Sequence, residues 1–204
     1  MFYDISMTIE PSMMVYKNKE AKKPIIKQVA AFEKEGVYES ELNFNLHTGT
    51  HIDFPLHTIK DGDTSDALDL MNLIGEAKVI DLTHLDQVID VNALKEYAIN
   101  EDDFILFKTK NSLKETFDFD FVYLNHEAAL YLKDKQVRGV GIDALGIERN
   151  QANHPTHNTL LGSGIIILEG IRLKAVKEGI YNLICLPLKI ANVEALPVRA
   201  ILSE

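Results

Sequence analysis

The sequence predicts one α/β domain over residues 1–204, with a mixed central sheet and flanking helices. Apolar runs alternate along the chain with stretches of helical periodicity, and the strand-like runs outnumber the helices, which come singly between them. Hydrophobic residues make up 46% and charged residues 25% of the 204 residues. These proportions are typical of a globular domain, and they exclude a disordered or collagen-like chain.

The N-terminal part of the chain is predicted to contain two strands, a loop and a helix. Residues 1–10 include the strand-like run FYDISMTI, and residues 11–25 concentrate turn-forming residues and lysines, as in a surface loop. Residues 26–36 carry apolar residues at helical spacing and end at a glycine, which predicts a helix. Residues 37–48 alternate between apolar and polar and predict a strand.

The rest of the chain alternates between short apolar strands and amphipathic helices. Strands are predicted at residues 77–82, 104–109, 137–144, 164–171, 182–190 and 196–202. Helices are predicted at residues 91–99 and 125–136, the second with Asn125 as its N-cap. Pro187 and Pro197 predict sheet edges or bulges in the last two strands.

Charge and cysteine usage exclude several functional classes. The net charge of −10 argues against a nucleic-acid partner, because phosphate backbones are bound by clustered Lys and Arg. A single cysteine, Cys185, excludes an internal disulfide and a cysteine-based zinc site, and its apolar surroundings predict a core position. Neither a signal peptide nor a membrane-spanning apolar stretch is visible, so we expect a cytoplasmic protein without a membrane partner.

Histidines are concentrated in the segment HTGTHIDFPLH. His47, His51, Asp53 and His57 have the same parity, so an extended segment would project all four from one face. Imidazole and carboxylate ligands suit zinc, manganese or iron(II), and the two oxygens of a carboxylate can bridge two ions. The alternative is a polar strand or loop whose histidines are satisfied by backbone carbonyls.

A shared ion requires this segment to bend. In a straight strand, His51 and Asp53 lie about 6.6 Å apart at Cα, within reach of one ion, whereas His47 lies about 13 Å from His51. Gly49 is the residue that permits the bend. Pro55 ends the extended segment and lets His57 be aimed independently.

A second candidate cluster occurs in HPTHNTLLGSGIIILEG. Glu169 follows four apolar residues, where a carboxylate is costly unless a partner such as a metal ion pairs with it. It could also lie beyond the strand in solvent. His157 precedes two leucines and a Gly-rich turn that could fold the following strand back beside it, whereas His154 is predicted to be an exposed loop histidine.

Other motifs carry less weight. Asp81 and Asp143 end predicted strands, where carboxylates serve as site residues or as helix caps with equal frequency. The chain has no G-x-S-x-G nucleophile elbow, no Walker motif and no complete dinucleotide-binding glycine pattern. The sequence therefore favours metal chemistry at the histidine clusters.

The segment HTGTHIDFPLH resembles the His-x-Gly-Thr-His-x-Asp-x-Pro-x-His signature of the cyclase-like metal-dependent hydrolases, which include bacterial kynurenine formamidase and isatin hydrolase. Three further segments resemble the family, so the likeness covers most of the chain: YDISMTIEPSMMVY, VRGVGIDALGIE and HNTLLGSGIIILEGI. The resemblance implies a swivelling β/α/β-type fold, a homodimer or higher homo-oligomer, and a site for one or two metal ions. Zn²⁺ is the first expectation and Mn²⁺ the alternative.

The resemblance also implies roles for six residues. His57 matches the general acid/base, Asp53 matches a bridging ligand, and the expected metal ligands are His47, His51, Asp53, His157 and Glu169. The expected activity is hydrolysis of an amide-type bond in a small-molecule substrate, such as an aryl formamide like N-formylkynurenine, or a related lactam. A non-catalytic metal-binding or sensor protein and a metal-dependent lyase or cyclase are the alternatives.

Overall fold

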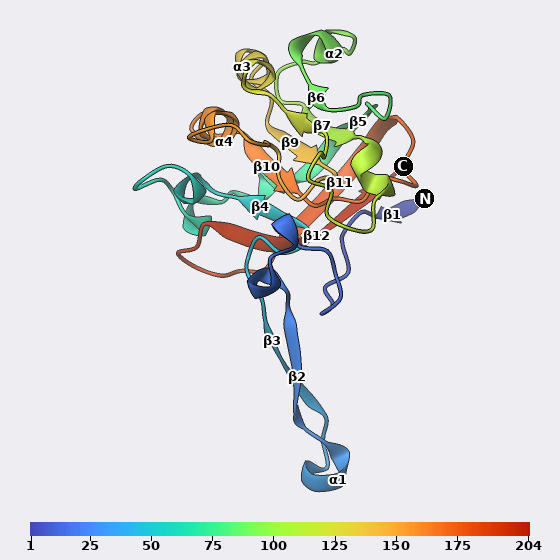
Figure 1. Ribbon diagram of the computed structural model, residues 1–204. Helices are drawn as coiled ribbons and strands as arrows, with labels where there is room; N and C mark the ends of the chain where they lie inside the picture. Colours follow the sequence, from blue (N-terminus) through green and yellow to red (C-terminus); the bar gives the residue numbers. More distant parts are fainter.

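The strands of the computed structural model, which describes residues 1–204, form one curved sheet with both parallel and antiparallel pairs (Figure 1). The strand order is β1-β12-β11-β5-β7-β9-β10-β4, and β12 also pairs with β4, so seven strands close into a mixed barrel with β1 outside the closure. The strands of this sheet are β1 (Phe2–Asp4), β4 (His51–Asp53), β5 (Ile74–Asp81), β7 (Phe104–Lys108), β9 (Gly139–Ile142), β10 (Ile166–Glu169), β11 (Gly179–Pro187) and β12 (Ala195–Ser203).

Alternate side chains of these strands fill the barrel. The interior cluster contains 18 buried residues, among them Phe104, Leu106 and Cys185, so the predicted core position of the cysteine is confirmed. Strand β9 contributes two glycines to this interior. A Cβ at Gly139 would lie 2.4 Å from the Phe104 ring, and one at Gly141 would lie 2.6 Å from Leu106. The GVG sequence therefore makes room for large side chains of the neighbouring strand.

Three helices pack on one side of the barrel (Figure 1). They are α2 (Val91–Lys95), α3 (His126–Asp134) and α4 (Pro155–Leu161), and with the outward residues of β5, β7, β9 and β10 they bury a second cluster of 25 residues. Asn125 caps α3 by accepting a hydrogen bond from the Ala128 amide, as predicted.

The remaining elements are short. Strands β6 (Val88–Ile89) and β8 (Tyr123–Leu124) form a separate parallel pair. The 3₁₀ turns are Tyr16–Asn18, Glu20–Lys22, Pro55–His57, Ser65–Ala67, Leu70–Leu73 and Lys110–Leu113.

A two-stranded arm projects from the body on the side away from α2, α3 and α4 (Figure 1). It consists of β2 (Ile25–Ala30), β3 (Glu39–Asn43) and the single-turn helix α1 (Phe32–Glu35) at its tip. The predicted helix over residues 26–36 is therefore wrong for most of its length. Residues 26–30 pair with β3, with an irregularity at Val29, and only the tip is helical. The strand predicted over 37–48 forms only at its centre.

Most predictions for the secondary structure of the body are confirmed. The mixed sheet and flanking helices are confirmed, and every predicted strand from residue 77 onward overlaps an observed one. The first strand is shorter than predicted, the helix at 91–99 ends at Lys95, and helix α4 was not predicted. Barrel closure was also not predicted, and the swivelling β/α/β arrangement stays a prediction. None of the helices has the length and apolar character needed to span a membrane.

Asp143 acts as a buried clamp at the end of β9. Its carboxylate accepts hydrogen bonds from the backbone amides and the hydroxyls of both Thr109 and Ser112, which lie in the connection after β7. Burial raises its pKa from 3.8 to about 6, against the lowering effect of these hydrogen bonds. The alternative that Asp143 is a structural residue is therefore the one that the structure supports.

Asp143 should make stability depend on pH. Because its folded-state pKa is raised, its contribution to the free energy of unfolding is complete below pH 3.8 and is lost as the pH rises through about 6. We expect the difference in unfolding free energy between wild type and Asp143→Asn to shrink by about 3 kcal/mol over this range, measured by urea unfolding. Asp134→Asn, on the exposed end of α3, is the control. Parallel pH profiles for wild type and Asp143→Asn would contradict this assignment.

Candidate metal centre

Strand pairing brings His51 and Asp53, two of the candidate ligands, next to a third, Glu169. Strands β4 and β10 are antiparallel, and their register places His51 opposite Glu169 and Asp53 opposite Ile167. The side chain of Ile52 points into the barrel, so His51 and Asp53 project from the other face of β4. All three polar residues are at most 4% exposed. The shared parity that the sequence suggested for His51 and Asp53 is confirmed.

The chain bends at Gly49 and brings His47 back to the cluster. Gly49 has φ +75°, and a Cβ there would lie 2.8 Å from Ile9. After this bend, His47 Nδ1 lies 3.2 Å from His51 Nε2 and 3.0 Å from Asp53 Oδ1. The predicted bend is therefore confirmed, because two histidines that would be about 13 Å apart in a strand lie in contact.

The third histidine comes from helix α4. His157 Nε2 lies 3.6 Å from Asp53 Oδ2 and 3.4 Å from Glu169 Oε1. The second oxygen of Glu169 lies 3.5 Å from His51 Nε2, and the Ile147 amide donates a 2.6 Å hydrogen bond to Oε1. The alternative of a solvent-exposed Glu169 is thus wrong, since the carboxylate lies between histidines from two distant segments.

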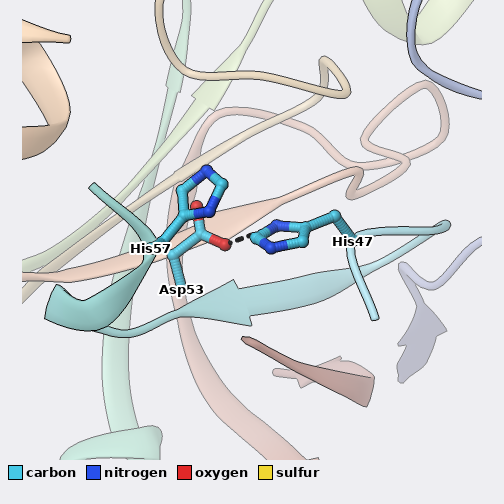
Figure 2. Close-up of side chains that lie close together, drawn as sticks. All are labelled: His47, Asp53 and His57. Atoms are coloured by element: carbon cyan, nitrogen blue, oxygen red, sulfur yellow. Dashed lines mark ion pairs between the residues drawn. The ribbon is translucent and has the colours of Figure 1, made fainter. Parts of the chain in front are cut away.

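Asp53 lies at the centre of the cluster (Figure 2). Its Oδ1 faces His47 at 3.0 Å and His51 at 3.5 Å, whereas its Oδ2 faces His157. Both oxygens are buried and accept no well-aligned hydrogen bond. A buried carboxylate without such partners costs several kcal/mol unless a cation neutralises it. The two oxygens, aimed at different histidines, have the geometry of a carboxylate that bridges two ions.

Each buried histidine directs Nε2 at the carboxylates and has an oxygen atom near Nδ1, which forms a hydrogen bond in His51 but not a well-aligned one in His157. His51 Nδ1 lies 2.9 Å from the Gly49 carbonyl oxygen, which favours a proton on Nδ1 and leaves Nε2 as a ligand atom. His157 Nδ1 lies 3.0 Å from Glu148 Oε1. Pairing of the distal nitrogen with a carbonyl or carboxylate is typical of metal-binding histidines.

Glu148 is a site residue that the sequence analysis missed. It is 5% exposed, and its Oε1 also lies 2.6 Å from His154 Nδ1, while Oε2 accepts from the Thr156 amide at the start of α4. The ring of His154 is largely exposed, as predicted, yet it lines the cavity. The spacing of Glu148 from His154 and His157 was the available signal, but only the unpredicted helix α4 brings the three together.

Glu148 should orient His157 for metal binding. We expect Glu148→Gln to weaken metal affinity about 10- to 100-fold, because the variant keeps an oxygen for the Thr156 amide but removes the charge beside His157. Competition with a chromogenic chelator measures this change, and Glu101→Gln on the surface is the control. Unchanged affinity in Glu148→Gln would limit Glu148 to capping α4.

His57 is the most accessible of the predicted site residues. It ends the 3₁₀ turn Pro55–His57, and its ring centroid lies 4.1 Å from that of His47 (Figure 2). Partial desolvation lowers the pKa of His57, and the nearby His47 and His157 rings lower it further, while Asp53 opposes them. A lowered pKa favours the neutral imidazole, which can accept a proton, at pH 7.

Charges within the cluster perturb one another strongly. Burial alone would raise the pKa of Asp53, but the imidazoles of His157 and His47 hold it well below its usual value. Burial also works against protonation of His157, yet the carboxylates of Asp53, Glu148 and Glu169 raise its pKa well above 6.5. The cluster therefore attracts positive charge, and a divalent cation that binds there must displace protons.

The cluster opens into a cavity of about 280 Å³, large enough for a small molecule. Its walls are mainly polar, and Tyr16 and Leu145 are the two hydrophobic residues among the thirteen that line it. Lys17 and Lys22 lie over Tyr16, with ammonium-to-centroid distances of 5.3 and 5.5 Å. The exposed His57 and the buried candidate ligands His157 and Glu169 all line this cavity.

These observations fit a divalent metal site. The donors are imidazole nitrogens and carboxylate oxygens, without sulfur, and Asp53 has two buried oxygens without aligned partners. All six residues predicted from the sequence lie together: His47, His51, Asp53, His57, His157 and Glu169. Asp53 belongs to two groups whose possible ligand atoms lie within 4.8 Å of one another, one with His47 and His57 and one with His51 and Glu169. A third such group consists of His157, Glu148 and His154.

Sequence comparison finds relatives along the whole chain. Residues 3–149 match the model of a family described as "Putative cyclase". A kynurenine formamidase from Salinibacter ruber (strain DSM 13855 / M31) is 30% identical over 213 residues, which cover 98% of this chain and 96% of that protein.

Solved structures with the same fold are also found. A predicted metal-dependent hydrolase from Bacillus stearothermophilus superposes with a TM-score of 0.91 at 46% identity, covering 99% of this chain and 97% of the other. Isatin hydrolase A from Labrenzia aggregata superposes with a TM-score of 0.85 at 22% identity, covering 99% and 93%, and this likeness concerns the fold alone.

Proposed function

The chain belongs to the cyclase family, and from that premise we propose that it is a metal-dependent hydrolase of an amide-type bond. The observation that carries the proposal is the position of Asp53, buried between histidines from two distant segments with each oxygen facing a different one. His47, His51, Asp53, His157 and Glu169 would hold one or two divalent ions. Zn²⁺ is the first candidate and Mn²⁺ the second, because both accept this ligand set.

His57 is the group proposed to move protons. A bound cation would lower the pKa of a water molecule and polarise the substrate carbonyl. The neutral His57 imidazole would take the proton from the attacking water and then give it to the departing nitrogen. Amide cleavage needs this second transfer, because an unprotonated amide nitrogen is a poor leaving group. The accessible position of His57 at the cavity supports this role.

The proposed substrates are small amides whose cleavage releases an amine. The relative from Salinibacter ruber is a kynurenine formamidase, which favours an aryl formamide such as N-formylkynurenine. The cavity of about 280 Å³ suits a molecule of that size or smaller, and a lactam such as isatin is the second candidate.

Metal analysis combined with a substrate panel tests the proposal. Purified protein should contain one or two equivalents of zinc or manganese and should turn over N-formylkynurenine, simple aryl formamides or isatin. Mass analysis of the products separates hydrolysis, which adds one water, from a lyase or cyclase reaction. Bound metal with no turnover of any amide or lactam would favour a metal-binding or sensor protein.

A further inference from the structure

Two lysines line the cavity beside the candidate metal ligands. Lys17 and Lys22 contribute to the same wall residues as the candidate ligand Glu169, and they belong to the 3₁₀ turns that precede β2. Lys22 is half-buried and Lys17 is exposed. The backbone of Lys22 is tied to the site, since its carbonyl oxygen accepts a hydrogen bond from Thr48 Oγ1, next to His47 in the chain. Positive charge is therefore built into a cavity that the candidate ligands also line.

Neither of these ammonium groups pairs with a carboxylate of the chain. Residues 17–23 contain four lysines, of which only Lys23 forms an ion pair, with a glutamate of the same segment. Burial and the neighbouring Lys19 ammonium lower the pKa of Lys22, and the carboxylates of the candidate ligands oppose this lowering only in part. The cavity thus contains two cationic groups with which an anion from outside the chain can pair.

The ring of Tyr16 holds both lysines at the cavity. Their ammonium nitrogens lie 5.3 and 5.5 Å from its centroid, at the distance of a cation–π contact, and the ring itself packs edge to face against Phe117. Lys17 and Asn18 have left-handed backbone, with φ of 57° and 51°, which is costly for residues other than glycine. Two like charges gathered on a strained turn are unfavourable for the chain alone, and strain of this kind is typical of ligand-binding segments.

We propose that Lys17 and Lys22 bind a carboxylate of the substrate, so that the enzyme acts on small amides of net negative charge. This inference rests on the proposed hydrolase function, because it concerns the part of the same substrate that does not react. The scissile carbonyl would lie at the candidate metal ligands and the carboxylate at the lysines. Hydrogen bonds between ammonium and carboxylate groups are stronger than neutral ones, particularly where water is partly excluded.

The same lysines disfavour a substrate that carries an ammonium group near its carboxylate. N-Formylkynurenine carries one of each and has no net charge. Its analogue with hydrogen in place of the α-amino group keeps the formamide and the carboxylate but has a net negative charge. Because the two lysines repel the α-ammonium group, we expect kcat/KM to be higher for this analogue than for N-formylkynurenine.

A matched series of aryl formamides tests the proposal. The ortho, meta and para formamidobenzoates are each compared with the corresponding neutral formamidobenzamide, and the ratio of their kcat/KM values is measured. For the best isomer, this ratio should be about 10- to 100-fold lower in Lys17→Gln/Lys22→Gln than in wild type, because the variant keeps polar side chains but loses both charges. Differences in intrinsic reactivity between the two substrates cancel in this comparison.

The matched control is another lysine of the same segment. Lys19 is exposed and does not line the cavity, so Lys19→Gln should keep the wild-type ratio. A ratio that is the same in wild type and in Lys17→Gln/Lys22→Gln for every isomer would overturn the proposed substrate class. It would leave the hydrolase function intact, because the formamides would still be cleaved.

Ligand binding separates the two proposals when no formamide is cleaved. Isothermal titration calorimetry of the metal-loaded protein with the aminobenzoates should show binding at least about 10-fold tighter in wild type than in Lys17→Gln/Lys22→Gln. This result without turnover of any formamide would refute the hydrolase function and support the carboxylate site. Equal affinity in wild type and the double variant would mean that the lysines do not bind the carboxylate, and it would overturn the inference.

Discussion

The Asp53→Ala variant is expected to lose its bound divalent metal and all activity above background. The two oxygens of Asp53 face different histidines, at 3.0 Å from His47 and 3.6 Å from His157. Its removal takes one ligand from both groups that contain it, and it removes one of the carboxylates that raise the pKa of His157. Metal content by plasma mass spectrometry measures the effect directly.

The control for this variant is another aspartate. Asp134→Ala removes an exposed carboxylate at the end of α3 and should retain the wild-type metal content. Circular dichroism should show that both variants fold, because Asp53 makes no well-aligned hydrogen bond that holds the barrel together. A folded Asp53→Ala protein with full metal content would refute the bridging role.

The His57→Ala variant is expected to keep its metal and to lose turnover by about 10²- to 10⁴-fold. We expect turnover to fall without loss of metal because His57 is exposed at the edge of the cluster, whereas the candidate ligands around Asp53 are buried or, for His47, half-buried. Steady-state kinetics on the best substrate of the panel, with metal content measured on the same sample, gives both readouts.

Two observations complete this test. His84→Ala, which removes an exposed histidine distant in sequence from the site, should leave turnover unchanged. In wild type, kcat/KM should fall only when the pH drops below the ordinary histidine range, because the pKa of His57 is lowered and the base stays neutral down to more acidic pH. Loss of metal from His57→Ala would instead make His57 a ligand.

The candidate site was largely predictable because its chemistry is local in sequence. Histidines and an aspartate at alternating positions, interrupted by Gly49, specify both the shared face and the bend. Glu169 could be paired with this motif because a carboxylate after four apolar residues needs a partner. For Glu148 the only signal was its spacing from His154 and His157, and its position beside them depends on helix α4, for which the sequence predicted no element.

The fold was less predictable where tertiary pairing decides the outcome. Residues 26–36 have helical spacing, yet the cross-strand partner at residues 39–43 selects a hairpin. Barrel closure depends on pairing between β12 and β4, which are far apart in sequence. The pattern of apolar residues within one strand does not indicate which distant strand it pairs with. The strands of the body overlap the predicted apolar runs, because the apolar side chains of these runs fill the two clusters of core residues.

The pairing of β12 with β4 has a consequence for the order of assembly during synthesis. His51 lies opposite Pro197, so the strand that carries two candidate ligands acquires this neighbour only after nearly the whole chain has left the ribosome. Contacts of such high sequence separation slow folding. We therefore expect nascent chains arrested before residue 195 to lack the high-affinity metal site, and the ion to bind only after translation has passed the last strand.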